Sequence, residues 1–440
     1  MAEAAGNAGT KLPPQADVVI AGGGIIGVSA AYYLAKAGVS VALCEKGRIA
    51  GEQSSRNWGY VRQQGRDPAE LPTIMESLRL WRGLGEEIGE DLGFRQTGVI
   101  YAAETEADMA SYESWLEIAK QYQLDTRLIS AQELKALLPD ADHKWAGALH
   151  TPSDGRAEPK KATPIIARAA ERLGAHIIPD CAVRGIETEG GRLSAVVTER
   201  GPIKTGALVF AGGAWSSLFC RNLGLELPAL NIRSSVLRTA PAPEVTEGAV
   251  WSKQVAIRRR EDGGYTVSHG YATEFLVTPA LLRYGHRFLA AYKMERKRLR
   301  IRLKRQFLDE LLRPTHWRND EVTPFEKTRV LDPPPNATIL NEALANLKRV
   351  YPVLKDVTVA ERWAGLIDVT PDAVPVISPA ESIPGLYLAT GFSGHGFGIG
   401  PGAGKVVAEM VAGGPETIDR SPFRYSRFFD GSDVRPWSPV

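Results

Sequence analysis

Residues 17–45 read DVVIAGGGIIGVSAAYYLAKAGVSVALCE. The first five residues form a short β-branched run, which predicts a strand buried on both faces. A glycine-rich turn follows, and after it we expect a helix from Ile25 to about Ala37, ended by Gly38. Residues 39–44 are typical of a second strand. This order predicts a Rossmann-type βαβ unit at the start of a parallel sheet.

The glycine-rich turn fits the pattern G-x-G-x-x-G with Gly22, Gly24 and Gly27. The first glycine permits a tight turn, the second lets the backbone approach a pyrophosphate, and the third lets the helix pack closely on the strand. Glu45 ends the second strand, where a carboxylate accepts hydrogen bonds from ribose hydroxyls and disfavours the 2′-phosphate of NADP. A glycine-rich turn alone would be weak evidence, but the strand, motif, helix, strand and acid arrive in order and together indicate a site for FAD or NAD. We also assign to this site Ile25 and Ile26, at the helix N-terminus, and Lys46.

The composition is that of an ordinary globular enzyme. The chain has 440 residues, 44% of them hydrophobic and 24% charged, with a formal net charge of +2. This length favours two domains, and the charge gives no support for nucleic-acid binding. The three cysteines Cys44, Cys181 and Cys220 form no CxxC motif, so we expect free thiols and a cytoplasmic location. Residues 1–16 lack the apolar core of a signal peptide and predict a disordered leader, and the glycines that interrupt 18–34 argue against a membrane span.

Three later segments carry further motifs. Residues 54–59 read SSRNWG, residues 208–215 read LVFAGGAW, and residues 385–398 read GLYLATGFSGHGFG. Together with the N-terminal motif they follow the order of a known family: the chain resembles the flavoprotein amine and amino-acid oxidases that include D-amino acid oxidase, glycine oxidase and sarcosine oxidase. The resemblance extends from about residue 17 to residue 411. It implies an α/β fold in which a Rossmann-type FAD-binding domain carries an inserted, discontinuous α+β substrate-binding domain.

We divide the chain accordingly. Residues 17–90, 151–225 and 345–415 are expected to form the FAD-binding domain, and residues 91–150 and 226–344 the substrate-binding domain. Residues 283–313 contain eleven Lys or Arg against three acidic residues and predict one long polar helix. A solvated helix face is the favoured interpretation of this run, with a membrane surface or a subunit contact in a homo-oligomer as alternatives.

The resemblance assigns cofactor-contacting positions residue by residue. It implies that the serine-rich segment lines the pyrophosphate and flavin ring, that the backbone of Val183 meets adenine, and that the Gly-His-Gly-Phe segment directs backbone N–H groups at the flavin pyrimidine oxygen. His395 itself has a structural or orienting role in this interpretation. The positions are Ser54, Ser55, Arg56, Asn57, Val183, Gly212, Gly213, Gly365, Gly394, His395, Gly396, Phe397 and Gly398.

Two positions depart from the sarcosine oxidases. Gly365 stands where some of them attach flavin through a cysteine, so we expect non-covalent FAD. Gly398 stands where they carry a lysine that helps to hold the substrate carboxylate, which argues against a sarcosine-type site. Nearby, Trp363 is either a core aromatic or a wall of the active site.

A substrate carboxylate requires an arginine in a partly dry cleft. Arg62 lies eight residues after Ser54, the offset at which sarcosine oxidases keep a carboxylate-binding arginine; a surface arginine is the alternative. Arg66 and Tyr271, the latter in the strand-like run 265–271, are weaker candidates for the same pocket.

These observations predict oxidative deamination of free amino acids, with L-amino acids favoured, to keto acid, ammonia and hydrogen peroxide. Hydride would leave Cα for the flavin, and molecular oxygen would be the final acceptor. The glycine-rich run 391–404 offers no second G-x-G-x-x-G for NAD(P)H, which disfavours a monooxygenase. The alternatives are a D-amino acid or secondary-amine oxidase or dehydrogenase that feeds a respiratory carrier, and an FAD-binding subunit of a larger complex. No metal site is predicted.

Overall fold

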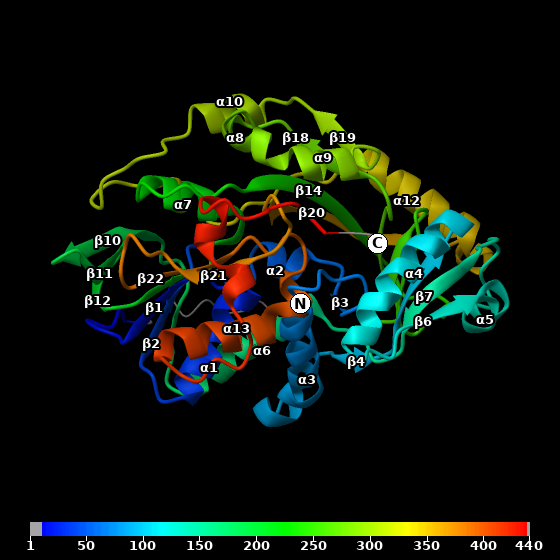
Figure 1. The fold of residues 1–440 in the computed structure, drawn as a ribbon, viewed down its shortest axis with the longest axis horizontal. Coiled ribbons are helices and arrows are strands. Elements are labelled where there is room, and N and C mark those ends of the chain that lie inside the picture. Colours follow the sequence, from blue (N-terminus) through cyan, green and yellow to red (C-terminus); the bar gives the residue numbers. More distant parts are fainter. Residues whose placement is uncertain (1–10, 438–440) are drawn as a thin grey trace.

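A computed structural model describes residues 11–437, which form two large sheets and two small three-stranded sheets (Figure 1). The sheet that holds the N-terminal motif has the order β21-β22-β13-β1-β2-β9; β21 runs antiparallel to β22, and the other pairs are parallel. Its strands are β1 (Val18–Ala21), β2 (Val41–Cys44), β9 (His176–Ile178), β13 (Leu208–Phe210), β21 (Val376–Pro379) and β22 (Leu386–Thr390). The α/β fold class expected from the sequence is confirmed.

The βαβ unit forms where the sequence predicts it. Helix α1 (Ile25–Lys36) connects β1 to β2, and Gly38 follows the helix with a left-handed φ of +80°. Val18 and Ile20 of β1 pack with α1 on one face of the sheet, whereas Val19 packs into a second core on the opposite face. A strand covered on both faces must be apolar at every position, which explains the continuous apolar run.

Helices cover one face of the parallel sheet and a small antiparallel sheet covers the other. The helices are α1, α3 (Leu71–Ile88), α6 (Pro159–Arg172) and α13 (Gly396–Ala412), and the small sheet consists of β10 (Val183–Glu189), β11 (Arg192–Thr198) and β12 (Gly201–Lys204). Glycines let α13 approach α1 closely, since a Cβ added at Gly400 would lie 2.5 Å from Cγ1 of Ile25. This contact holds the N-termini of both helices close to the same edge of the sheet (Figure 1).

The second sheet is large and mixed, with the order β19-β18-β14-β17-β16-β15-β5-β7-β6, and β20 pairs with β14. Its strands are β5 (Val99–Ala103), β6 (Arg127–Ser130), β7 (Gly147–Thr151), β14 (Leu230–Thr239), β15 (Ala249–Trp251), β16 (Ala256–Arg259), β17 (Tyr265–Ser268), β18 (Thr273–Leu276), β19 (Leu299–Arg302) and β20 (Val359–Val369). Strands from residues 91–150 and from residues 226–344 thus meet in one sheet.

The boundary drawn at residue 345 differs from the structure. Strand β20 pairs antiparallel with β14 from Leu230↔Val369 to Thr239↔Val359, so it belongs to the large sheet. Helix α12 (Ala337–Val350) packs against the same sheet, with Leu340 in the core that holds Tyr265. Because β14 and β20 are separated by more than a hundred residues, their pairing leaves no local signal in the sequence.

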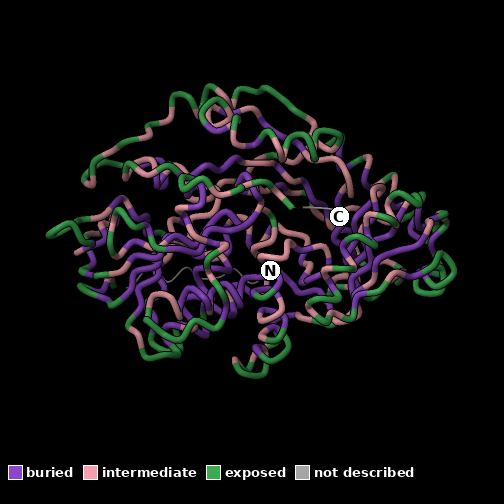
Figure 2. The backbone as a smooth tube through the Cα atoms, viewed as in Figure 1, coloured by how far each residue is buried: buried purple, intermediate pink, exposed green. Residues whose placement is uncertain are grey.

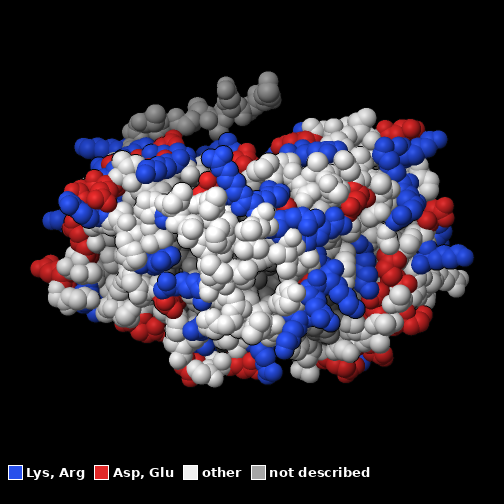
Figure 3. All heavy atoms as spheres, turned by 90° about the horizontal axis from the view of Figure 1, so that it is seen from above, with Lys and Arg blue, Asp and Glu red and all other residues white. Residues whose placement is uncertain are grey.

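The basic run 283–313 is not one long helix. It contributes to α8 (Pro279–Tyr284) and forms η2 (Gly285–Phe288), α9 (Leu289–Glu295), β19 and α10 (Gln306–Leu311). The helical elements cover the large sheet, β19 is the edge strand of that sheet, and we call the whole segment the roof (Figure 1). Residues 299–302 read LRIR, an alternation with period two, and β19 pairs parallel with β18 through Thr273↔Leu299. Figure 3, viewed from above, shows Lys and Arg side chains gathered on this face beside a hollow.

Short elements complete the described chain. They are α2 (Gln53–Arg56), β3 (Tyr60–Val61), β4 (Arg95–Gln96), α4 (Glu106–Gln121), α5 (Ala131–Leu137), β8 (Gly155–Arg156), η1 (Gly213–Trp215), α7 (Ser216–Asn222), α11 (Pro324–Lys327), η3 (Pro352–Leu354), η4 (Ser421–Phe423) and η5 (Tyr425–Phe428). Buried residues follow the strands of both sheets, while much of the roof is exposed (Figure 2). No helix within residues 11–437 is both long and apolar enough to cross a bilayer.

The expected disordered leader is ordered in part. Gln15 forms a parallel bridge with Lys204, and the backbone nitrogen of Ala16 donates to the carbonyl of Lys204 at 3.0 Å. Leu12 packs against the core beneath the small sheet. These contacts place a short strand-like segment beside β12. Residues 1–10 lie outside the described part of the chain.

Candidate active site

A cavity of about 1070 Å³ is lined by residues of both sheets and of the roof. This volume exceeds the range of about 300–1,000 Å³ typical of pockets for small molecules, so it suits a dinucleotide with a substrate beside it. The predicted residues that line it are Gly22, Gly24, Ile25, Ile26, Glu45, Lys46, Ser54, Arg56, Asn57, Arg62, Val183, Gly212, Gly213, Tyr271, Gly365, Gly394, His395, Gly396, Phe397 and Gly398. Gly27, Ser55 and Trp363 are absent from the lining.

The turn between β1 and α1 forms a cradle of bare backbone. Gly22 has a φ of +117°, and a Cβ there would lie 2.4 Å from the carbonyl oxygen of Ala211. At Gly24 a Cβ would lie 3.1 Å from Oγ of Ser54, which accepts from the backbone nitrogen of Ile25 at 2.8 Å. Gly27 acts through packing, since its Cβ would lie 1.9 Å from the carbonyl of Gly22. A side chain would fill this cradle, and a diphosphate at the N-terminus of α1 fits it.

Glu45 lies at the end of β2 with both carboxylate oxygens engaged. Oε2 accepts from the backbone nitrogen of Gly23 at 2.7 Å, and Oε1 accepts from that of Gly47 at 2.8 Å. Burial raises the pKa of Glu45, and these two hydrogen bonds oppose the shift. Each oxygen keeps a further lone pair for a ribose hydroxyl.

Lys46 lines the cavity, but its ammonium group is hydrogen-bonded to other protein groups. Nζ donates to Oε1 of Glu52 at 2.6 Å and to the carbonyls of Thr328 and Arg329 at 2.8 and 2.9 Å. An ammonium has three donors, so this side chain has none left for a phosphate. Its contribution to the cavity is its backbone and stem.

Helix α2 fastens the cradle to strand β20. The buried guanidinium of Arg56 donates through Nη1 to the carbonyl of Ala364 at 2.8 Å and to Oδ1 of Asp332 at 2.7 Å. A Cβ at Gly365 would lie 3.3 Å from Cβ of Arg56, so the two positions touch. Ser55 turns away from the cavity and donates to the carbonyl of Glu52 at 3.2 Å.

Trp363 contacts the outside of this junction. Its Nε1 donates to the carbonyl of Arg56 at 2.9 Å, and the ammonium of Lys160 lies 5.2 Å from its ring centre. Gly365 lines the cavity together with residues 366–369, whereas Trp363, two residues earlier in β20, lies outside its lining. Trp363 therefore supports the cavity from outside through Arg56 and does not line it.

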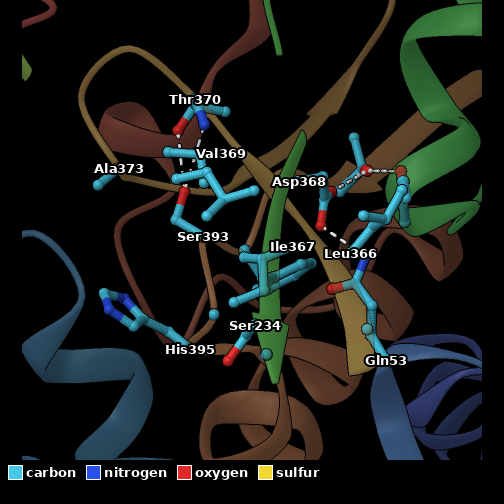
Figure 4. Close-up of a pocket in the computed structure, with 18 of the residues that line it drawn as sticks. Gln53, Ser234, Leu366, Ile367, Asp368, Val369, Thr370, Ala373, Ser393 and His395 are labelled. Atoms are coloured by element: carbon cyan, nitrogen blue, oxygen red, sulfur yellow. Dashed lines mark hydrogen bonds between the residues drawn. The ribbon is translucent and has the colours of Figure 1, made fainter. Parts of the chain in front are cut away.

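Asp368 organises the loop before α13, and sequence reasoning missed it. Oδ2 accepts from the backbone nitrogen of Gly391 at 2.7 Å and from Oγ1 of Thr390 at 3.1 Å, while Oδ1 accepts from Nε2 of Gln53 at 2.9 Å. Figure 4 shows Asp368 and Gln53 pointing toward each other, from β20 and α2. The carboxylate is buried, and burial raises its pKa. Asp368 therefore fixes the approach of the Gly394–Gly398 segment to the cradle.

His395 precedes α13 and pairs with a buried acid. Nδ1 of His395 lies 2.9 Å from Oε2 of Glu70, which has no exposed side-chain surface. Burial and the charge of Arg66 lower the pKa of His395, against the opposing effect of Glu70. Gly396, Phe397 and Gly398 open the 17-residue helix α13 at the cavity. The backbone N–H groups of such a first turn stabilise negative charge.

The other end of the cavity carries aromatic rings and guanidinium groups. The rings of Tyr101 and Trp251 have centroids 5.1 Å apart. The guanidinium carbon of Arg62 lies 5.2 Å from the Tyr101 ring centre, and that of Arg298 lies 5.2 Å from the ring centre of Tyr271. All five residues line the cavity. The motif search found Arg62 and Tyr271 and missed the other three, which come from separate strands and from the roof.

Arg62 lies beside the start of α13. A Cβ at Gly398 would lie 3.6 Å from the backbone nitrogen of Arg62 and 3.1 Å from the carbonyl of Tyr60. The same closeness leaves little room for a side chain at Gly398. Nη1 of Arg62 donates to the carbonyl of Gln64 in a short contact. Arg66 lines the cavity as well, and its buried Nη1 has no partner within residues 11–437.

A dinucleotide cradle that opens onto an arginine-bearing pocket beneath a mixed sheet defines a flavoprotein oxidoreductase. Residues 17–410 match the model of the family described as FAD dependent oxidoreductase, so the chain belongs to that family. The resemblance inferred from the sequence is confirmed, and the enzyme is an FAD-dependent oxidoreductase of the amino-acid and amine oxidase type.

The proteins that this chain resembles are named both for primary amino acids and for secondary amines. The structure of L-amino acid deaminase from Proteus myxofaciens, in complex with anthranilate, is 35% identical and has a TM-score of 0.91; the match covers 95% of this chain and 94% of that chain. L-proline dehydrogenase from P. horikoshii is 27% identical with a TM-score of 0.78, over 96% and 100% of the two chains. Sarcosine oxidase subunit beta of Arthrobacter sp is 27% identical over 424 residues, which cover 94% of this chain and 91% of the relative.

Proposed function

We propose that the chain catalyses the oxidative deamination of free L-amino acids to keto acids, ammonia and hydrogen peroxide. One observation supports this most directly: the cavity runs without interruption from the dinucleotide cradle to Arg62, whose backbone lies beside the start of α13. The likeness to L-amino acid deaminase at 35% identity supports the L-amino acid class.

The residues of the cradle would hold FAD without a covalent bond. Gly22, Gly24 and the N-terminus of α1 would bind the diphosphate, and Glu45 the adenosine ribose. The start of α13 would face the pyrimidine end of the flavin, where its N–H groups favour the negative charge of the reduced state. When bound, FAD supplies the two-electron oxidation of the amine.

Arg62 would fix the substrate. A guanidinium binds a carboxylate through two parallel hydrogen bonds, and this orients the Cα–H bond relative to the cofactor. Tyr101 shields one side of the Arg62 guanidinium from solvent, which strengthens such a pair. The imine product then hydrolyses to a keto acid and ammonia.

The proposal also includes the electron acceptor, the cellular compartment and the oligomeric state. Molecular oxygen is the proposed electron acceptor, the cytoplasm the proposed compartment, and a homo-oligomer the proposed assembly. The alternative is a dehydrogenase that passes electrons to a respiratory carrier, and the likeness to L-proline dehydrogenase supports it.

Anaerobic mixing tests the proposal. The FAD-loaded enzyme is mixed with L- and D-enantiomers of Phe, Leu, Gln, Glu and Arg, with sarcosine and glycine as controls, while the flavin absorbance is followed. We expect bleaching by L-amino acids and reoxidation by oxygen with peroxide release. Bleaching by sarcosine alone, or by D-amino acids alone, would overturn the substrate class. Bleaching by L-amino acids followed by reoxidation with a quinone but not with oxygen would overturn the acceptor.

A further inference from the structure

The basic run 283–313 sends one guanidinium into the cavity. All eleven Lys and Arg residues of the run lie in the described chain, and Arg298 is the only one among them that lines the cavity. Its position is set by the backbone: the nitrogen of Arg298 donates to the carbonyl of Glu295 at 2.8 Å, and its own carbonyl accepts from the nitrogen of Thr273 at 3.0 Å. The pairing of β19 with β18 in the large sheet therefore holds Arg298 in the lining of the substrate end.

The guanidinium of Arg298 has few polar partners among the described residues. Within residues 11–437 it makes no hydrogen bond, and its one ion pair is with Oε2 of Glu295 at 3.5 Å. Its neighbour Arg300 differs, because Nη2 donates to Oε2 of Glu342 at 2.6 Å. Arg298 instead rests against aromatic rings, with its guanidinium carbon 5.2 Å from the centre of Tyr271 and 5.9 Å from that of Trp251. Such stacking orients the planar group and leaves its hydrogen-bond donors free.

Arg62 and Arg298 lie at the two ends of one aromatic pair. Arg62 contacts Tyr101, Tyr101 contacts Trp251, and Trp251 contacts Arg298. Arg62 is the end beside α13, where the cofactor is proposed to lie, and Arg298 is the end that belongs to the roof. A substrate whose α-carboxylate binds Arg62 would extend its side chain along the two rings toward a second cation.

We propose that Arg298 binds an acidic group in the substrate side chain, so that the preferred substrates are amino acids with a second carboxylate, of the aspartate and glutamate class. This inference rests on the proposed function, because it assumes that Arg62 takes the α-carboxylate. A bidentate guanidinium–carboxylate pair at Arg298 discriminates strongly against the neutral amide, which offers only one acceptor oxygen and no charge.

Kinetics with acidic and neutral isosteres test the inference. The FAD-loaded enzyme, Arg298→Met and the control Arg300→Met are assayed with L-Glu, L-Asp, L-Gln and L-Asn, using a redox dye as acceptor. For the wild type we expect kcat/KM for the acids to exceed that for the amides by roughly a hundredfold, carried mainly by KM. Arg298→Met should reduce this ratio to within about threefold of one, and Arg300→Met should leave it unchanged. A ratio near one in the wild type, or a ratio that Arg298→Met does not change, would overturn the inference.

A binding measurement separates this inference from the proposed reaction. Glutarate and butyrate are titrated into the same three FAD-loaded proteins, and the change in the flavin spectrum gives each Kd. We expect glutarate to bind at least tenfold more tightly than butyrate in the wild type and in Arg300→Met, and equally in Arg298→Met. If this pattern appears while no amino acid is oxidised, the proposed reaction is wrong and the recognition of the second carboxylate stands. If amino acids are oxidised but glutarate binds no more tightly than butyrate, the proposed reaction stands and the recognition of a second carboxylate by Arg298 is wrong.

Discussion

Nδ1 of His395 lies 2.9 Å from Oε2 of Glu70 at the entrance to helix α13. Burial, with the charge of Arg66, lowers the pKa of His395. Burial raises the pKa of Glu70, but the hydrogen bond from His395 and the charges of Arg66 and Arg62 oppose it, and the net shift is downward. Both groups therefore bind fewer protons in the native state than in the unfolded chain over the acidic range.

This pair predicts a loss of stability on acidification. An unfolded histidine takes up a proton at about pH 6.5, while native His395 resists it, so stability falls below that pH by at most about 1.4 kcal/mol per unit. Thermal unfolding of the FAD-saturated protein between pH 5 and pH 8 measures the slope. His395→Gln should flatten it, and His176→Gln, at an exposed position, should not. Equal slopes in wild type and His395→Gln would show that other groups carry the pH dependence.

Asp368 should be a support for both stability and cofactor binding. Asp368→Asn replaces one acceptor oxygen by an amide nitrogen, which then faces a donor at Gly391 or Gln53. A buried unsatisfied donor costs about 1–3 kcal/mol, so we expect a lower Tm and weaker FAD binding. Differential scanning calorimetry and FAD titration measure the two effects, with Asp140→Asn as an exposed control. An unchanged Tm would mean that the loop before α13 does not depend on the carboxylate.

The parts of the fold that sequence predicts are those with local signals. The βαβ unit is local, since Gly22, Gly24 and Gly27 lie within six residues and the strands flank them directly. The charge count of the roof predicts a polar helix, whereas the alternation of Leu299 and Ile301 is a local strand signal that agrees with the structure. A count of charges does not record their spacing, and the spacing decides the secondary structure.

The site was predictable only where a motif carries it. Gln53 and Asp368 are 315 residues apart and meet only because β20 joins the large sheet and returns to α2. Arg298 is one of eleven basic residues in its run, and only the pairing of β19 with β18 selects it. These contacts form only in the tertiary structure, and no local sequence pattern predicts them.

The backbone cradle at Gly22 and Gly24 predicts that FAD binding depends on the absence of a side chain at Gly24. Gly24→Val places a branched side chain against Oγ of Ser54, so the diphosphate loses its approach and we expect the purified variant to be colourless. Gly83→Val, in an open and exposed part of α3, is the matched control and should remain yellow. Flavin absorbance per protein chain is the measurement. A yellow Gly24→Val protein would contradict this account of the cradle.

The cofactor should leave intact when the protein is denatured. Gly365 stands where the family resemblance would place a flavin-attaching cysteine, and a Cβ there would meet only the stem of Arg56. Acid precipitation of the wild-type protein should therefore leave FAD in the supernatant, identified by its chromatographic mobility. Flavin that remains with the pellet would indicate a covalent bond through another residue.

Arg62 should control substrate binding and leave the cofactor alone. Arg62→Lys keeps the charge but loses the planar fork, so it cannot form two parallel hydrogen bonds to a carboxylate. The loss of such a pair costs about 2–3 kcal/mol, which corresponds to an increase in KM of roughly 30- to 150-fold. The flavin spectrum should not change, because the backbone of Arg62, rather than its side chain, lies beside Gly398. Arg82→Lys, whose guanidinium pairs with Gln96 on the surface, controls for a general effect of the substitution. If Arg62→Lys keeps the wild-type KM, the carboxylate is held elsewhere, and the buried Arg66, with its unpartnered Nη1 in the described structure, becomes the residue to test next.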